Sequence, residues 1–174
     1  MANIEKLLRE NSGIRLDIGC GEQKQPGFIG MDSQKLPGVD IVHNMEKLPW
    51  PLPDESVVTA VAHHVLEHID PAQGKFIKVM DELWRVMKPG GQFAFVTPYA
   101  GSVGYWQDPT HCNGITEVTV YYFCPEEEYT NGKLYSFYRP KPWKISMLSY
   151  NVQGVIECVL VKIPDKKEYH AKAK

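Results

Sequence analysis

Apolar residues gather in several short runs of the chain, each closed by glycine, proline or polar residues, and in the first run, residues 14–18, they stand at every second position. Such short runs are typical of strands, and we expect strands over residues 14–18, 28–31, 40–43, 57–62 and 92–97. Before the last of these, Asp70-Pro71-Ala72-Gln73 has the residues of a helix start, and apolar residues follow at helical spacing up to Pro89-Gly90-Gly91. Strands that alternate with a helix predict an α/β fold with a mostly parallel sheet.

The end of the chain shows a different pattern. Trp143–Tyr150 and Val155–Ile163 are two strand-like runs joined by four turn residues, which predicts a C-terminal antiparallel hairpin. The length of 174 residues and the 43% hydrophobic content fit a single domain over residues 1–163. We expect Ile4 to Glu10 to form a short amphipathic helix at a sheet edge, and the polar residues 164–174 to be a disordered tail.

A glycine turn at the end of the first strand carries the strongest chemical signal. The run Leu16-Asp17-Ile18-Gly19-Cys20-Gly21 reads as a strand that ends in two glycines, and the second strand ends next to Asp32. Glycines let the backbone turn sharply and lie close to a ligand. Because parallel neighbours end at the same sheet edge, the Asp32 carboxylate can accept hydrogen bonds from both hydroxyls of a ribose there. This pattern predicts a site for an adenosine-containing cofactor.

The residues around the glycines distinguish between cofactors. A dinucleotide site needs a third glycine and a helix start against its pyrophosphate, but Lys24 stands where that glycine belongs and Pro26-Gly27 interrupts the short turn. Asp17 would repel a phosphate, yet it suits a ligand that carries an ammonium or sulfonium group. These residues favour S-adenosylmethionine and disfavour a NAD-dependent oxidoreductase.

At this point the chain resembles the class I S-adenosylmethionine-dependent methyltransferases, in particular their small-molecule, type 11-like branch. Besides the glycine turn, the resemblance rests on residues 44–51, 64–69 and 82–91, which follow in the family's order and extend the match over about residues 14–111. It implies a Rossmann-like sheet with helices on both faces and S-adenosyl-L-methionine as the cofactor. The chain departs from the family at Gln23 and Val58, where a small residue and an acid are common. The implied cofactor-binding residues are Asp17, Gly19, Cys20, Gly21, Asp32, Ser33, Asn44, Met45, Ala62 and His63.

Residues 98–140 have few regular signals but hold ten of the nineteen aromatic residues. The segment starts at the sheet edge where open α/β folds bind ligands, so we interpret it as a substrate lid or insert, the alternative being a satellite core. Its turn Asp108-Pro109-Thr110-His111 is similar to turns in small-molecule O-methyltransferases. We therefore expect a small-molecule acceptor that is methylated on a hydroxyl oxygen, with His111 or His64 as general base and Tyr99 as a positioning group.

The run His64-Val65-Leu66-Glu67-His68 also matches the H-x-x-E-H signature of zinc peptidases, which is the rival function from another class. It follows a strand directly and precedes Pro71, so the helix that these ligands need has too little room. A third ligand would have to come from Glu126, Glu127 or Glu128, for which no pattern gives support. We expect no metal.

Charge and composition limit the kinds of molecule that the protein is expected to bind. A formal net charge of -2 and scattered basic residues disfavour nucleic acid, so a nucleic-acid methyltransferase is a minor alternative. The amino terminus lacks an apolar signal region and no run has the length of a membrane span, which predicts a cytoplasmic protein without a membrane partner. The four cysteines lack metal-site spacing and are expected to be reduced thiols. A protein that binds the cofactor without catalysis is the non-enzyme alternative.

Overall fold

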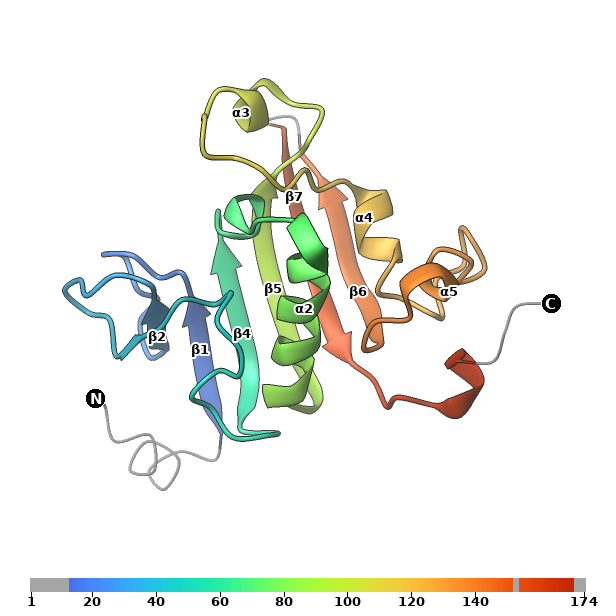
Figure 1. The fold of residues 1–174 in the computed structure, drawn as a ribbon, viewed down its shortest axis with the longest axis horizontal. Coiled ribbons are helices and arrows are strands. Elements are labelled where there is room, and N and C mark those ends of the chain that lie inside the picture. The colour runs from blue at the N-terminus through green and yellow to red at the C-terminus, as the bar shows by residue number, and fades with distance from the viewer. Residues whose placement is uncertain (1–12, 152–153, 171–174) are drawn as a thin grey trace.

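The computed structural model describes residues 13–151 and 154–170, which are built around a seven-stranded sheet of order β3-β2-β1-β4-β5-β7-β6 (Figure 1). The first five strands pair in parallel, whereas β7 is antiparallel to both β5 and β6. The strands and the C-terminal hairpin predicted from the sequence are confirmed, as is the mostly parallel Rossmann-like sheet flanked by helices. The strands are β1 (Ile14–Ile18), β2 (Ile29–Asp32), β3 (Ile41–Val42), β4 (Val57–His63), β5 (Met87–Pro98), β6 (Trp143–Tyr150) and β7 (Val155–Lys162).

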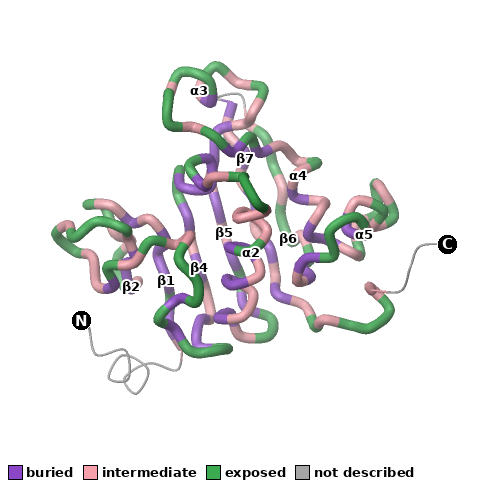
Figure 2. Tube along the Cα trace, viewed as in Figure 1, coloured by how far each residue is buried: buried purple, intermediate pink, exposed green. Residues whose placement is uncertain are grey.

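The core lies between this sheet and α2 (Lys75–Val86), the helix that connects β4 to β5 (Figure 1). Figure 2 shows buried residues along β1, β4 and β5, with α2 beside β5. Full burial of one such aliphatic or aromatic side chain contributes about 1.5–3 kcal/mol. On α2 the buried apolar residues are Val79, Met80, Leu83 and Val86, and the strands contribute Ile14, Leu16, Ala60, Ala62, Phe93, Phe95, Ile156, Cys158 and Leu160.

The start of α2 differs from the sequence-based expectation. The Asp70 carboxylate does accept a hydrogen bond from the backbone N–H of Ala72, at 2.9 Å, as a helix-capping acid does. The turn that it caps is only the short 3-10 helix η2 (Ala72–Gly74), because Gln73 has a φ of 57° and Gly74 a φ of 68°. This left-handed pair breaks the helical path, so the α-helix begins at Lys75 rather than at Pro71.

The aromatic segment 98–140 contains three short helices, α3 (Val103–Trp106), α4 (Glu117–Tyr121) and α5 (Tyr135–Tyr138). Backbone hydrogen bonds hold it to the short 3-10 helix η1 (Leu66–His68): Cys112 and Asn113 each donate an N–H to the Glu67 carbonyl at 2.9 Å. Some of its aromatic residues pack into the core, whereas Trp106 is 76% exposed. The segment therefore combines scaffold with surface, as the alternative of a satellite core allowed.

Residues 164–170 include the 3-10 helix η3 (Lys167–His170). Lys141 pairs with Asp165 at 2.7 Å, which connects the start of this segment to the body of the fold. The expected disorder of the tail stays a prediction. The expected helix at Ile4 to Glu10 and residues 171–174 lie outside the described part of the chain.

The cysteines and the lengths of the helices can be compared with what the composition predicts. Cys20, Cys112, Cys124 and Cys158 are all free thiols, as predicted. Within the described ranges, every helix is too short or too polar to cross a membrane.

The loop after β3 is fastened to α2 by a buried carboxylate. Glu82 Oε1 accepts hydrogen bonds from the Trp50 backbone N–H and from Arg85 Nη2, both at 2.6 Å, and its Oε2 accepts one from Arg85 Nε at 2.9 Å. Burial alone raises the pKa of Glu82, but the hydrogen bonds from Arg85 and Trp50 outweigh it and hold the pKa below its ordinary value of 4.5. The folded structure thus stabilises the ionised form of Glu82.

Replacing this carboxylate should destabilise the protein. We expect Glu82→Gln to lower the free energy of unfolding by about 1.5–3 kcal/mol at neutral pH, the usual contribution of hydrogen bonds to a charged group. Because folding lowers the pKa of Glu82, its contribution is present above pH 4.5 and is lost as the pH falls below that value. Urea unfolding at several pH values measures both effects, with the exposed Glu128→Gln as the control. Equal stability of the two variants would contradict the prediction.

Candidate active site

The turn between β1 and β2 needs glycine for steric reasons. Gly19 has a φ of 65°, and a Cβ added there would lie 2.5 Å from a methyl carbon of Val65. Its N–H donates to the Met31 carbonyl at 2.7 Å, which joins the ends of the two strands. Gly21 also has a left-handed φ, of 52°. The two glycines therefore let the chain reverse at the carboxyl edge of the sheet without blocking the space in front of it.

Asp32 is oriented by this turn. Its Oδ2 accepts a hydrogen bond from the Gly21 N–H at 3.0 Å, and its Oδ1 accepts one from the Gln34 N–H at 2.9 Å. Each carboxylate oxygen can accept more than one hydrogen bond, so both keep capacity for a diol. The carboxylate is fixed in direction before any ligand binds.

A cavity of about 440 Å³ opens in front of Asp32 and the glycine turn. Five of the expected cofactor-binding residues line it, namely Gly19, Asp32, Ser33, Asn44 and Met45. The sequence analysis did not assign the further lining residues to the cofactor site, because they lie at the end of β2, in the loops after β2 and β3, or in and around η1, and their place at the cavity depends on how these segments fold together. These residues are Met31, Gln34, His43, Glu46, Val65, His68 and Ile69.

The other expected cofactor-binding residues do not line this cavity. Asp17 is buried and accepts a hydrogen bond from the Gln25 N–H at 2.7 Å, and burial raises its pKa. Burial, followed by the charges of Asp17 and Asp32, raises the pKa of the Cys20 thiol to about 11. Both side chains hold the turn together from the inside. Gly21 contributes its N–H to Asp32, whereas Ala62 is fully buried and His63 is exposed at the end of β4.

The chain makes an unusual bend where β4 ends. His64 has a φ of 53°, an uncommon left-handed conformation for a residue other than glycine. The bend directs the chain into η1 and places the His64 side chain, which is 55% exposed, between two cavities. Behind it, Glu67 is completely buried, and its Oε1 lies 3.3 Å from His64 Nδ1. Strained residues of this kind are frequent at functional sites.

A second cavity, of about 410 Å³, adjoins the first and shares His64 and His68 with it. Its other lining residues come from η1, the end of β5, the turn at residues 107–111 and the start of β7. His111 lies in this wall, with its side chain 8% exposed. The structure thus brings His64 and His111 to one cavity. Tyr99 is not among the residues that line either cavity; its ring packs 4.8 Å from that of Tyr150.

The protonated nitrogen of His111 follows from its partner. Its Nδ1 lies 2.7 Å from the Tyr105 carbonyl oxygen, which can only accept a hydrogen bond. Nδ1 therefore carries the proton, and in the neutral ring Nε2 has a free lone pair. The turn around His111 is fixed by Asp108, whose Oδ1 accepts hydrogen bonds from the N–H and hydroxyl of Thr110 at 2.8 and 2.7 Å. His111 can accept a proton, or hold another electrophile, at a defined atom.

A mostly parallel sheet with a glycine turn, an oriented carboxylate and two adjoining cavities at the carboxyl ends of its parallel strands is the kind of arrangement at which open α/β folds bind nucleoside cofactors. Comparisons with known proteins show what the chain is similar to. Residues 24–95 match the family model described as "Methyltransferase domain". A probable S-adenosylmethionine-dependent methyltransferase of Mycolicibacterium smegmatis is 44% identical over an alignment of length 102, and the match covers 48% of this chain and 37% of that protein. The chain thus spans little more than a third of the length of this relative.

Solved structures agree in fold. A SAM-dependent methyltransferase from Archaeoglobus fulgidus superposes with a TM-score of 0.58 at 18% identity, covering 91% of this chain and 92% of that one. A 16S rRNA adenine methyltransferase from Catenulisporales acidiphilia gives a TM-score of 0.58 at 14% identity, with 94% and 91% covered. Residues 24–95 are therefore similar to a methyltransferase domain, and the chain has the fold of the S-adenosylmethionine-dependent methyltransferases. The cofactor of these similar proteins is S-adenosyl-L-methionine.

Proposed function

We propose that this domain transfers the methyl group of S-adenosylmethionine to a hydroxyl oxygen of a small molecule. One observation carries the proposal: the cavity in front of Asp32 and the cavity beside His111 share His64 and His68 as a common wall. A cofactor in the first cavity and an acceptor in the second would meet at that wall. Holding two reactants in line can lower a barrier by up to about 7–11 kcal/mol.

Asp32 would bind the ribose hydroxyls, and Asn44 and Met45 would lie against the adenine. Asp17, Cys20, Gly21, Ala62 and His63 support the turn and the end of β4 around the methionine portion. The cofactor supplies an activated methyl group, so the protein must mainly align the acceptor. As the O–CH₃ bond forms, the S–CH₃ bond breaks with its electron pair going to sulfur, and S-adenosylhomocysteine leaves.

The hydroxyl proton must go to a base. His111 Nε2 has a free lone pair in the second cavity, and His64 lies on the wall between the cavities, so these two histidines are the candidates. Tyr99 remains a predicted positioning group that acts from beside the cavity. A small acceptor fits the cavity volume of about 410 Å³, and the net charge of -2 gives no general attraction for a phosphate backbone.

Two measurements test the proposal. Calorimetry should show binding of S-adenosylmethionine and S-adenosylhomocysteine at micromolar concentration and none of NAD. Radiolabelled S-adenosylmethionine should then label one class in a panel of hydroxylated small molecules, amines, carboxylates and total RNA. Labelling of RNA alone would favour a nucleic-acid methyltransferase, and cofactor binding without any labelling would favour the non-catalytic alternative.

A further inference from the structure

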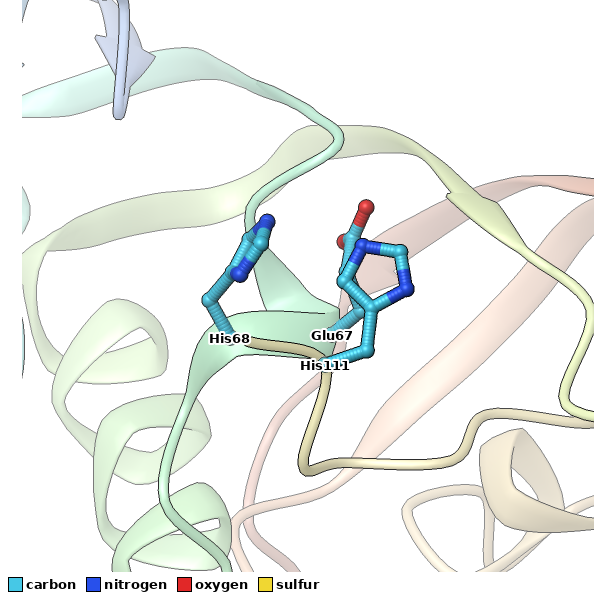
Figure 3. Close-up of side chains that lie close together, drawn as sticks. All are labelled: Glu67, His68 and His111. Carbon is cyan, nitrogen blue, oxygen red and sulfur yellow. The ribbon is translucent and has the colours of Figure 1, made fainter. Parts of the chain in front are cut away.

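We propose that Glu67, His68 and His111 form a binding site for a divalent transition-metal ion of the zinc type. Each offers one ligand atom, and these atoms lie within 4.8 Å of one another (Figure 3). Glu67 and His68 belong to η1, and His111 reaches them from the turn after α3, as Figure 3 shows. The hydrogen bonds from Cys112 and Asn113 to the Glu67 carbonyl fix the two segments against each other.

In both histidines the Nδ1 atom donates a hydrogen bond, so the Nε2 atom has a free lone pair that can bind an ion. His111 Nδ1 donates to the Tyr105 carbonyl, as described above. His68 Nδ1 lies 3.1 Å from Thr110 Oγ1, whose only proton is donated to Asp108 Oδ1. The threonine oxygen therefore accepts from His68, which leaves the His68 Nε2 lone pair free as well. Metal-binding histidines are typically oriented in this way, with the second ring nitrogen donating to an oxygen.

Glu67 provides an independent observation. It has no exposed surface, and Thr97 Oγ1 donates to its Oε2 at 3.0 Å. Its Oε1 is buried and accepts no hydrogen bond from the described ranges, although His64 Nδ1 lies 3.3 Å from it and can pair with it when that ring is protonated. Burying a carboxylate oxygen without a hydrogen-bond donor is unfavourable, so a cation that binds this oxygen would be stabilised. An ion held between the two imidazoles would supply that partner.

The set of donors selects the kind of ion. Two imidazole nitrogens and one carboxylate oxygen suit zinc and related ions, and a site with three protein ligands keeps a position open. Bonds to zinc are about 2.0–2.2 Å long, so the ligand atoms must approach one another by about 1 Å on binding. His68 is exposed and can turn to do so.

The methyl acceptor could bind at the open coordination position of the ion. All three ligands line the second cavity, so an acceptor oxygen there could complete the coordination. This part of the inference rests on the proposed function, whereas the metal site itself does not. The expectation of no metal concerned His64 and His68 and rested on the short space for a helix and on the lack of a third ligand. The site proposed here instead combines Glu67 and His68 of that run with His111 from the turn at 107–111.

The test uses the full chain purified without a histidine tag and stripped with a chelator. Titration of zinc against a chromophoric competitor should show one equivalent bound at micromolar or lower concentration, and cobalt should give the visible absorption of a low-coordinate site. Glu67→Gln, His68→Gln and His111→Gln should each weaken zinc binding about tenfold or more. His170→Gln, which removes a histidine paired with Asp165 outside the site, should leave it unchanged.

Binding of S-adenosylhomocysteine is measured on the same samples. A protein that binds S-adenosylhomocysteine but not zinc would overturn the metal site and leave the proposed function intact. Zinc binding that persists in all three site variants would overturn it too, because the ion would then lie elsewhere. Because Glu67 is buried, its replacement can disturb folding, whereas His68 is exposed and its variant is expected to fold. Circular dichroism checks the folding of every variant.

Discussion

Methyl transfer by the His111→Ala variant is expected to be about 10²–10⁴-fold slower than that of the native protein, with affinity for S-adenosylhomocysteine nearly unchanged. This is the usual contribution of a positioned general base. The binding of the cofactor should not suffer, because His111 lines the second cavity and not the one in front of Asp32. The measurement is a single-turnover rate with an acceptor identified by the labelling panel.

The pH dependence of the defect shows how His111 acts. If its Nε2 takes the hydroxyl proton, the defect should shrink as the pH rises and the acceptor ionises without help. If Nε2 holds a metal ion, the variant should lose zinc and activity together, and added zinc should restore part of the rate. If the variant unfolds or no longer binds S-adenosylhomocysteine, segment 98–140 has a structural role instead. His64 is then the better candidate for the general base. His170→Gln again serves as the control.

The sheet could be predicted from the sequence because each strand has its own local signal. Apolar alternation in β1, the mostly apolar runs of β4 and β7, and the turn residues between strands are local signals that place these strands. The start of α2 was misplaced for an equally local reason. The capping signal of Asp70 is genuine, but it is satisfied within one 3-10 turn before Gln73 and Gly74 break the helical path.

For part of the candidate site, the position of a residue in a motif is enough to predict that it lines the cavity. Gly19, Asp32 and Asn44 line the cavity because a strand end or the loop after it carries them there. Asp17 and Cys20 were expected at the ligand from the same motif, yet both side chains point into the fold and hold the turn. Neighbours in sequence at a strand end can face opposite ways, and the motif alone does not say which residue turns inward.

The grouping of Glu67, His68 and His111 could not be predicted, because it depends on contacts distant in sequence. The backbone hydrogen bonds of Cys112 and Asn113 to the Glu67 carbonyl bring the turn at 108–111 onto η1. Nothing in the local sequence of either segment specifies that pairing. The sequence did identify both segments as chemically unusual, one as a metal-like motif and the other as an acceptor-site turn.

Asp32→Ala should weaken the binding of S-adenosylmethionine and S-adenosylhomocysteine about ten- to hundredfold, since losing hydrogen bonds to a charged group typically removes about 1.5–3 kcal/mol. Asp32→Asn should retain the backbone contacts with Gly21 and Gln34 better, because one amide oxygen can still accept, yet it loses the charge that favours the ribose hydroxyls. The matched control is Asp40→Asn: Asp40 directly precedes β3 and accepts a hydrogen bond from the Gly30 N–H of β2 at 2.8 Å, but it lies outside the cavity lining. Calorimetry with S-adenosylhomocysteine measures all three variants. If the two Asp32 variants fold and bind as tightly as the control, the ribose is held elsewhere and the cavity in front of Asp32 is not the cofactor site.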